Sequence, residues 1–223
     1  MKEADAREAI CKVGKSLFDR GYVHGTSGNI SVRLDDGFLI TPTDACLGFL
    51  QPERLSLTDS AGRHVAGDRP SKTLFLHQKI YSAALRFDAT IRCVIHTHST
   101  YCVQLSFATN GAEMLPALTP YFVMKVGHVP MIPYFRPGDP CAAEWVAEEI
   151  ERRGDSGMPV RAVMLPRLGP NVWGASPFHA MALLEELEET ARLACGLASM
   201  GTVVMPLDAA QLADLKSVFG SHW

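Results

Sequence analysis

The segments of this sequence that have the composition of strands follow one another through short turns, and this pattern limits the folds open to the chain. Residues 30–33 and 38–41 are joined at Asp35-Asp36-Gly37, which predicts a β-hairpin. Apolar runs at residues 91–98, 122–126, 129–134 and 160–165 predict further strands. Strands joined by tight turns rather than by helical crossovers pair antiparallel. We therefore expect a mixed, largely antiparallel sheet.

Helices are predicted before, within and after these strands. Apolar residues recur at three- and four-residue spacing over residues 6–17, and Gly21 stands where that helix would stop. A second helix is predicted from Ser71, as its cap, to about residue 86. Other helix starts are indicated at Asp139-Pro140, Ser176-Pro177 and Asp208 with Gln211. In the long helix after residue 176, the residues expected to face outward are Glu185, Glu188 and Glu189. Helices packed on a sheet predict an α/β fold.

Composition and charge narrow the classes of function. The 223 residues can bury the core of one domain and contain no linker, so residues 1–223 are expected to form a single domain. The net charge of −3 and the scattered Lys and Arg residues argue against a nucleic-acid partner. The charged first 20 residues argue against a secretory signal, and no apolar run approaches the roughly 20 residues of a membrane span. We expect a soluble cytoplasmic protein with no membrane partner.

The triplet His96-Thr97-His98 is the most informative chemical signal. It ends an apolar segment, and residues two apart on a strand point to the same side. Two imidazoles so placed could bind one divalent metal ion. Two ligands do not complete a site, and the alternative is a pair of histidines hydrogen-bonded beneath a polar surface.

Three turn-rich segments could bind an anion. They are residues 25–29 (G-T-S-G-N), residues 41–43 (T-P-T) and Ser71-Lys72, which offer small side chains, backbone N–H groups and one cation. Taken singly, an ordinary turn or cap is the more frequent explanation for each. Tyr121 and Tyr134, near Lys125, are proton donors or anion contacts in one interpretation and core or interface aromatics in the other.

Taken together and in this order, the motifs resemble the class II aldolase/adducin family over nearly the whole chain. They are G-T-S-G-N-I-S at residues 25–31, T-P-T at 41–43, G-D-R-P-S-K at 67–72 and H-T-H-S-T at 96–100. Three later segments resemble the 3-oxo-tetronate 4-phosphate decarboxylase branch of this family: T-P-Y-F-V-M-K-V-G (119–127), P-Y-F-R-P-G-D (133–139) and E-E-L-E-E-T-A (185–191). The resemblance to L-fuculose-phosphate aldolase is more distant. The resemblance implies a three-layer α/β/α domain, assembled as a homotetramer with active sites between subunits.

The resemblance also implies a lyase site for a small phosphorylated sugar or sugar acid. The residues that would contact the phosphate are Gly28, Asn29, Thr43, Ser71 and Lys72. His96 and His98 would hold a divalent metal, typically zinc, which stabilises the enediolate formed when a carbon–carbon bond breaks. Tyr121 would take part in proton transfer. Decarboxylation and retro-aldol cleavage share that intermediate.

At two positions the sequence departs from the family pattern. Thr73 stands at the acid/base position, where the family has a glutamate, and a hydroxyl cannot replace a carboxylate base near neutral pH. Leu168 stands where the family has a third metal-binding histidine. Three explanations are open. In the first, the metal site is rearranged and uses His77, or His128 of a neighbouring subunit. In the second, Arg167 stabilises an oxyanion without a metal ion. In the third, the chain is a non-catalytic member of the family, as adducin is.

Overall fold

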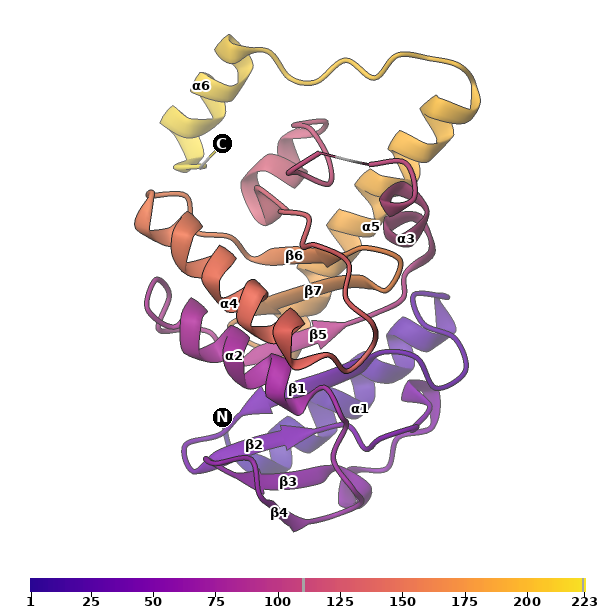
Figure 1. Cartoon of the computed structure of the whole chain (residues 1–223), viewed down its shortest axis with the longest axis vertical. Helices are drawn as coiled ribbons and strands as arrows, with labels where there is room; N and C mark the ends of the chain where they lie inside the picture. Colours follow the sequence, from indigo (N-terminus) through magenta and orange to yellow (C-terminus); the bar gives the residue numbers. More distant parts are fainter. Residues whose placement is uncertain (110, 222) are drawn as a thin grey trace.

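An antiparallel sheet forms the centre of the fold (Figure 1). The computed structural model describes residues 1–109, 111–221 and 223, and within them seven strands lie in the order β4-β3-β2-β1-β5-β7-β6. Each neighbouring pair is antiparallel. The strands are β1 (Asn29–Arg33), β2 (Gly37–Ile40), β3 (Ser56–Asp59), β4 (His64–Ala66), β5 (Cys93–His96), β6 (Ala162–Leu165) and β7 (Gly169–Gly174).

Helices cover both faces of this sheet and give three layers (Figure 1). On one face lie α1 (Glu3–Asp19) and α5 (Pro177–Ser199), with α3 (Thr100–Ser106) packed against α5. On the other face lie α2 (Leu74–Ala84) and α4 (Pro140–Asp155). Shorter elements are the helical turns η1 (Leu47–Phe49), η2 (Pro52–Arg54) and η3 (Phe122–Val126), and the C-terminal helix is α6 (Ala209–Phe219). The predicted α/β fold with its antiparallel sheet is confirmed.

Helix α1 shows how the apolar pattern becomes packing. The residues that repeat at helical spacing, Ala6, Ile10, Val13 and Leu17, are all fully buried in the cluster that α1 and α5 share with the sheet. Full burial of each of the larger three contributes roughly 1.5–3 kcal/mol relative to exposure. None of the helices in the described residues is long and apolar enough to cross a membrane.

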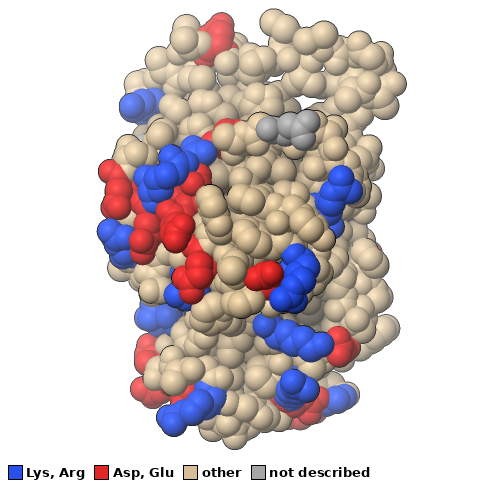
Figure 2. Space-filling model, in the orientation of Figure 1, with Lys and Arg blue, Asp and Glu red and all other residues tan. Residues whose placement is uncertain are grey.

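Helices α2 and α4 pack against each other as well as on the sheet. Their apolar sides meet through Ile80 and Ile150, while ion pairs join their exposed sides, including Lys79 with Glu144 and Arg86 with Glu151. Figure 2 shows acidic and basic side chains intermingled over these two helices. Because exposed ion pairs contribute only about 0–1 kcal/mol, apolar burial is the main force that holds this layer together.

Two predicted strands are absent from the described structure. Residues 122–126 form the π-helical turn η3, in which the backbone N–H of Gly127 donates to the carbonyl of Phe122. Residues 129–134 form only isolated bridges, through Pro130 and Met131. A short apolar run has the same composition in a buried strand and in a buried helical turn, so its tertiary contacts decide between them.

Two local predictions about helix ends and faces are also wrong. Helix α2 starts at Leu74, not at Ser71, and its N-cap residue Thr73 makes no side-chain cap. Glu188 does not face outward, because its carboxylate is buried and accepts the backbone N–H groups of Tyr101 and Cys102 at 2.8 and 2.9 Å. These N–H groups belong to the first turn of α3, so an acidic side chain from α5 caps that helix. The helix starts predicted at Asp139, Ser176 and Asp208 are confirmed, and each of these side chains accepts a backbone N–H of its helix.

Candidate functional site

A cavity of about 630 Å³ opens at one end of the layer formed by α2 and α4. Its walls come from the turn before β1, the turn after β2, the segment that enters α2, the end of β5, and the segments before α4 and β7. The predicted site residues on these walls are Gly28, Asn29, Thr43, Ser71, Lys72, Thr73, His96 and His98. The fold thus brings together residues that lie up to 70 positions apart in the chain.

The turn before β1 can be built only with a glycine at position 28. Gly28 has φ of +83°, and a Cβ there would lie 2.8 Å from a methyl group of Val23 and 3.0 Å from the carbonyl oxygen of His96. The next residue, Asn29, is 6% exposed, and its Oδ1 has no hydrogen-bond partner within the described chain. The close approach of this turn to the end of β5 places the Asn29 amide beside His96.

The opposite wall offers hydroxyl groups and cations. The hydroxyls of Ser71 and Thr73 lie 2.9 Å apart, and the ammonium of Lys72 and the guanidinium of Arg136 belong to the same lining. The backbone N–H of Ser71 is already used by the carbonyl of Thr41, at 3.2 Å. Ser71 can therefore offer an anion its hydroxyl group but not its backbone N–H.

His96 and His98 lie at the floor of the cavity. His96 is the last residue of β5, whereas His98 follows the strand, so the same-face argument for the pair does not apply. Their ring centroids are nevertheless 5.1 Å apart. The Nδ1–H of His96 donates to the carbonyl of Pro170 at 3.0 Å, which leaves the lone pair on Nε2. Burial, followed by the neighbouring His98, lowers the pKa of His96 to about 3.

The ligand set of a resident zinc ion is not complete at this site. A structural or catalytic zinc site normally takes three or four protein ligands. Across residues 1–109, 111–221 and 223, no group of three or more His, Cys, Asp or Glu side chains is arranged to hold a metal. Leu168 instead packs on an apolar cluster, and the Thr73 hydroxyl is bonded to Ser71. Two imidazoles from one chain do not fit the metal centre that the resemblance implies.

Three other candidate residues lie away from the cavity lining. Tyr121 is 59% exposed, with the ammonium of Lys125 4.8 Å from its ring centroid. The guanidinium of Arg167 stacks on Phe107 at 5.0 Å and does not line the cavity, whose cations are Lys72 and Arg136. His128 stacks on the ring of Trp223 and does not line the cavity.

A row of polar side chains lies beneath the cavity floor and includes a residue that the sequence reasoning missed. In the strand register His96 is opposite Asn29 on one side and Asn171 on the other. Asn171 is fully buried, and neither atom of its amide has a partner within the described chain. His77 is also fully buried, with Nδ1 2.7 Å from Oγ of Ser31. No sequence pattern placed Asn171 in a strand, so only the sheet register identifies it as a buried polar group that normally needs a partner.

Comparisons with known proteins agree with this architecture. Residues 8–195 match the family described as Class II Aldolase and Adducin N-terminal domain. The chain is 46% identical to a 3-oxo-tetronate 4-phosphate decarboxylase of Cupriavidus necator over 229 aligned positions, covering 99% of each chain. It is 32% identical to an L-fuculose phosphate aldolase of Methanococcus vannielii, covering 85% of this chain and 94% of that one. The crystal structure of YgbL from Klebsiella pneumoniae superposes with a TM-score of 0.82 at 37% identity, covering 96% and 99% of the two chains.

Proposed function

This chain belongs to the class II aldolase and adducin family, and we propose that it is a carbon–carbon lyase that decarboxylates a small phosphorylated sugar acid in the cavity that His96 and His98 line. Its relatives include a 3-oxo-tetronate 4-phosphate decarboxylase and an L-fuculose phosphate aldolase, so two reactions are available to the fold. The choice between them depends on which chemical groups each reaction needs.

Decarboxylation of a 3-oxo acid makes a small demand on the protein. The bond between the carboxyl carbon and its neighbour breaks, carbon dioxide leaves, and the electron pair moves through that neighbour onto the ketone oxygen. The resulting enolate is then protonated on carbon. Because the substrate carries its own electron sink, no base has to remove a proton to start the reaction. Retro-aldol cleavage, in contrast, starts with removal of a hydroxyl proton and needs a general base.

Thr73 is the observation that favours decarboxylation. It stands in the cavity at the family's acid/base position, and its hydroxyl is 2.9 Å from Oγ of Ser71. A neutral hydroxyl is not a general base near neutral pH, so a reaction that needs one is disfavoured. Decarboxylation needs only stabilisation of the negative charge that develops on the ketone oxygen, and these residues can provide it.

The roles that we assign use both walls. The phosphate would be bound between them by the small, hydroxyl-bearing and cationic residues Gly28, Asn29, Thr43, Ser71 and Lys72. Arg136, on the same lining, is placed to bind the carboxylate or the developing oxyanion. The Arg136 guanidinium also lies 3.5 Å from a carboxylate oxygen of Asp139. When it pairs with the substrate oxygen it lowers the barrier, because the negative charge grows there in the transition state.

The family typically uses a divalent metal, and zinc would add Lewis-acid stabilisation of the same oxygen. His96 and His98 supply only two donors, so we assign no step to a metal in this chain. Zinc, a cytoplasmic location and a homotetramer in which Tyr121 reaches the cavity of a neighbouring copy remain proposals. The missing carboxylate and third histidine also favour one alternative, a family member that binds a phosphorylated acid without converting it.

The test compares two substrates and three variants. Wild-type protein is assayed for carbon dioxide release from 3-oxo-tetronate 4-phosphate and for cleavage of L-fuculose 1-phosphate. We expect the first reaction and not the second. Ser71→Ala and Asn29→Ala should each raise KM about tenfold, because each removes a hydrogen bond to a charged group. Ser82→Ala, at an exposed position on α2, is the matched control and should leave KM unchanged.

The other outcomes separate the alternatives. Cleavage of L-fuculose 1-phosphate would show that the argument from Thr73 is wrong. No turnover, together with a rise in melting temperature that Ser71→Ala abolishes, would establish the non-catalytic alternative. No turnover and no thermal shift would contradict the assignment of the cavity itself.

A further inference from the structure

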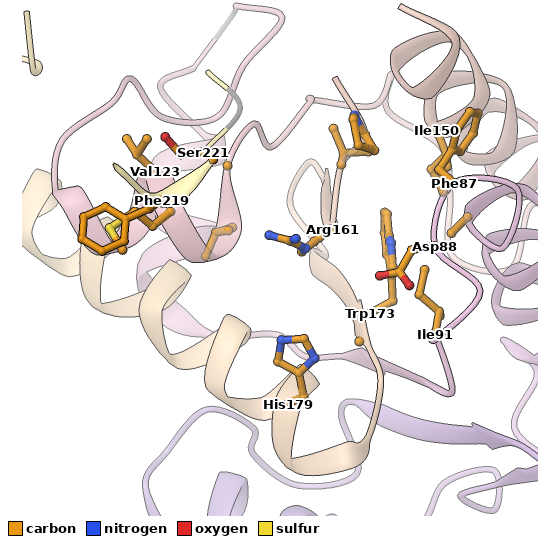
Figure 3. Close-up of a pocket in the computed structure, with 18 residues that line it drawn as sticks. Phe87, Asp88, Ile91, Val123, Ile150, Arg161, Trp173, His179, Phe219 and Ser221 are labelled. Carbon is orange, nitrogen blue, oxygen red and sulfur yellow. The ribbon is translucent and has the colours of Figure 1, made fainter. Parts of the chain in front are cut away.

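A second cavity, of about 250 Å³, lies at the other end of the α2–α4 layer (Figure 3). Each helix contacts both cavities with opposite ends. In α2, Leu76 lines the first and Ala84 the second, and in α4, Ala143 lines the first and Ile150 the second. The remaining walls come from the segment before β6, from the end of β7, from the start of α5, from η3 and from the end of α6 with the residues that follow it. The second cavity is therefore separate from the proposed phosphate site.

An unpartnered donor marks this cavity. Trp173 is 1% exposed and belongs to the lining, and its indole Nε1–H has no acceptor within the described chain. A buried N–H group without an acceptor costs free energy that a ligand oxygen or a water molecule would recover. The hydroxyl of Ser221, on the opposite wall, is likewise buried and without a partner among the described residues.

A cation and a further donor lie around the same space. One N–H of the Arg161 guanidinium donates to the carbonyl of Lys125 at 3.0 Å, which holds the side chain at the lining and leaves its other N–H groups for a ligand. Nδ1 of His179 accepts the backbone N–H of Ala175 at 3.2 Å, so the proton of the neutral ring is on Nε2. Figure 3 shows Arg161, His179 and Trp173 around the central space.

Several apolar side chains also line this cavity. Phe87, Ile91, Ile150, Val160, Val123 and Phe219 supply aromatic and branched side chains. The lining also contains one carboxylate, that of Asp88, whose Oδ1 accepts the N–H and the hydroxyl of Thr90 at 2.9 and 2.6 Å. Asp88 is thus bound to donors of its own loop, whereas the indole N–H of Trp173 keeps no acceptor among the described residues.

We propose that this second cavity binds a small monocarboxylic acid with an apolar body. The carboxylate would accept hydrogen bonds from Arg161 and from the indole N–H of Trp173, and the apolar body would pack between Phe87 and Ile150. The volume admits one small ring or branched chain, and it excludes a molecule as large as a nucleotide.

Benzoate is the probe for this proposal, with benzyl alcohol as an uncharged molecule of similar shape. Binding to the intact protein is measured by isothermal titration calorimetry. We expect Arg161→Gln and Trp173→Phe each to weaken benzoate binding about tenfold or more, because each removes a donor to a charged oxygen. Trp173→Phe retains an aromatic ring and deletes the unpartnered N–H, so this variant should fold. Benzyl alcohol should bind more weakly than benzoate to the wild-type protein.

A control from the first cavity distinguishes the two sites. Arg136→Gln removes one of the two cations of the first cavity, the other being Lys72, and should leave benzoate binding unchanged. Loss of benzoate binding in Arg136→Gln, or equal affinity in wild type and Arg161→Gln, would overturn the proposal. No heat of binding to wild type up to the solubility limit of benzoate would overturn it as well. None of these three results depends on lyase activity.

Discussion

The histidine beneath the cavity floor makes the stability of this protein sensitive to acid. His77 is fully buried, Nδ1 is within hydrogen-bond distance of the Ser31 hydroxyl, and Nε2 has no partner within the described chain. Burial, followed by the nearby His96, lowers the pKa of His77 from 6.5 to about 3. The folded state therefore holds this ring neutral at a pH where the unfolded chain already binds a proton.

The sign and size of the effect follow from this difference. Since the folded pKa lies below the unfolded pKa, the stability associated with His77 is complete above pH 6.5 and is lost as the pH falls toward about 3. Each unit of pH within this window costs about 1.4 kcal/mol per histidine. At about pH 5 the loss from His77 alone is about 2 kcal/mol relative to about pH 7.5.

Urea unfolding of wild type and His77→Gln at about pH 7.5 and about pH 5 measures this loss. The wild-type free energy of unfolding should fall by about 2 kcal/mol more than that of the variant, because glutamine does not titrate. Ser82→Ala, exposed on the same helix, serves as the control and should fall as much as wild type. An equal loss in wild type and His77→Gln would refute the reasoning, since the acid sensitivity would then arise elsewhere.

Three further predictions concern the backbone, the site and the C-terminal helix. Gly169→Ala should lower the free energy of unfolding by about 3 kcal/mol or more in urea titrations, because φ is +138° and the new Cβ would lie 1.9 Å from the carbonyl oxygen of Thr97. The double variant Thr73→Glu/Leu168→His should bind close to one zinc ion per chain in elemental analysis, whereas the wild-type protein should bind far less. An unchanged zinc content would contradict the idea that this chain has lost only these two residues from an ancestral zinc site. Asp208→Ala should reduce amide-exchange protection in α6 by about 1 kcal/mol by removing its capping box, and unchanged protection would show that packing alone holds the helix.

Signals that act within a few residues were readable from the sequence. The apolar spacing of residues 6–17, the caps at Asp139, Ser176 and Asp208, and the first hairpin depend on local sterics and hydrogen bonds. Each of these elements was predicted within a few residues of its observed bounds. The family resemblance, and with it the fold class, also came from short ordered motifs, and residues 8–195 match that family.

Signals that depend on distant contacts were not readable in the same way. The strand-like run at residues 122–126 became a helical turn, and the short strands β3, β4 and β7 were not predicted because short or polar segments acquire strand structure only from their partners. Glu188 was assigned to solvent from helical periodicity alone. Its burial is explained by the unpaired N–H groups of α3, which no spacing in α5 could reveal.

The sequence by itself determined which residue types the site has and which it lacks, since Thr73 and Leu168 carry no group that can act as a base or bind zinc. Only the tertiary structure decided which residues meet. The sheet register sets Asn171 beside His96, a loop before α4 brings Arg136 to the cavity, and the contact with Phe107 draws Arg167 away from it. The physical reason is that strand pairing joins residues far apart in the chain, so convergence depends on the register of the whole sheet rather than on any local pattern.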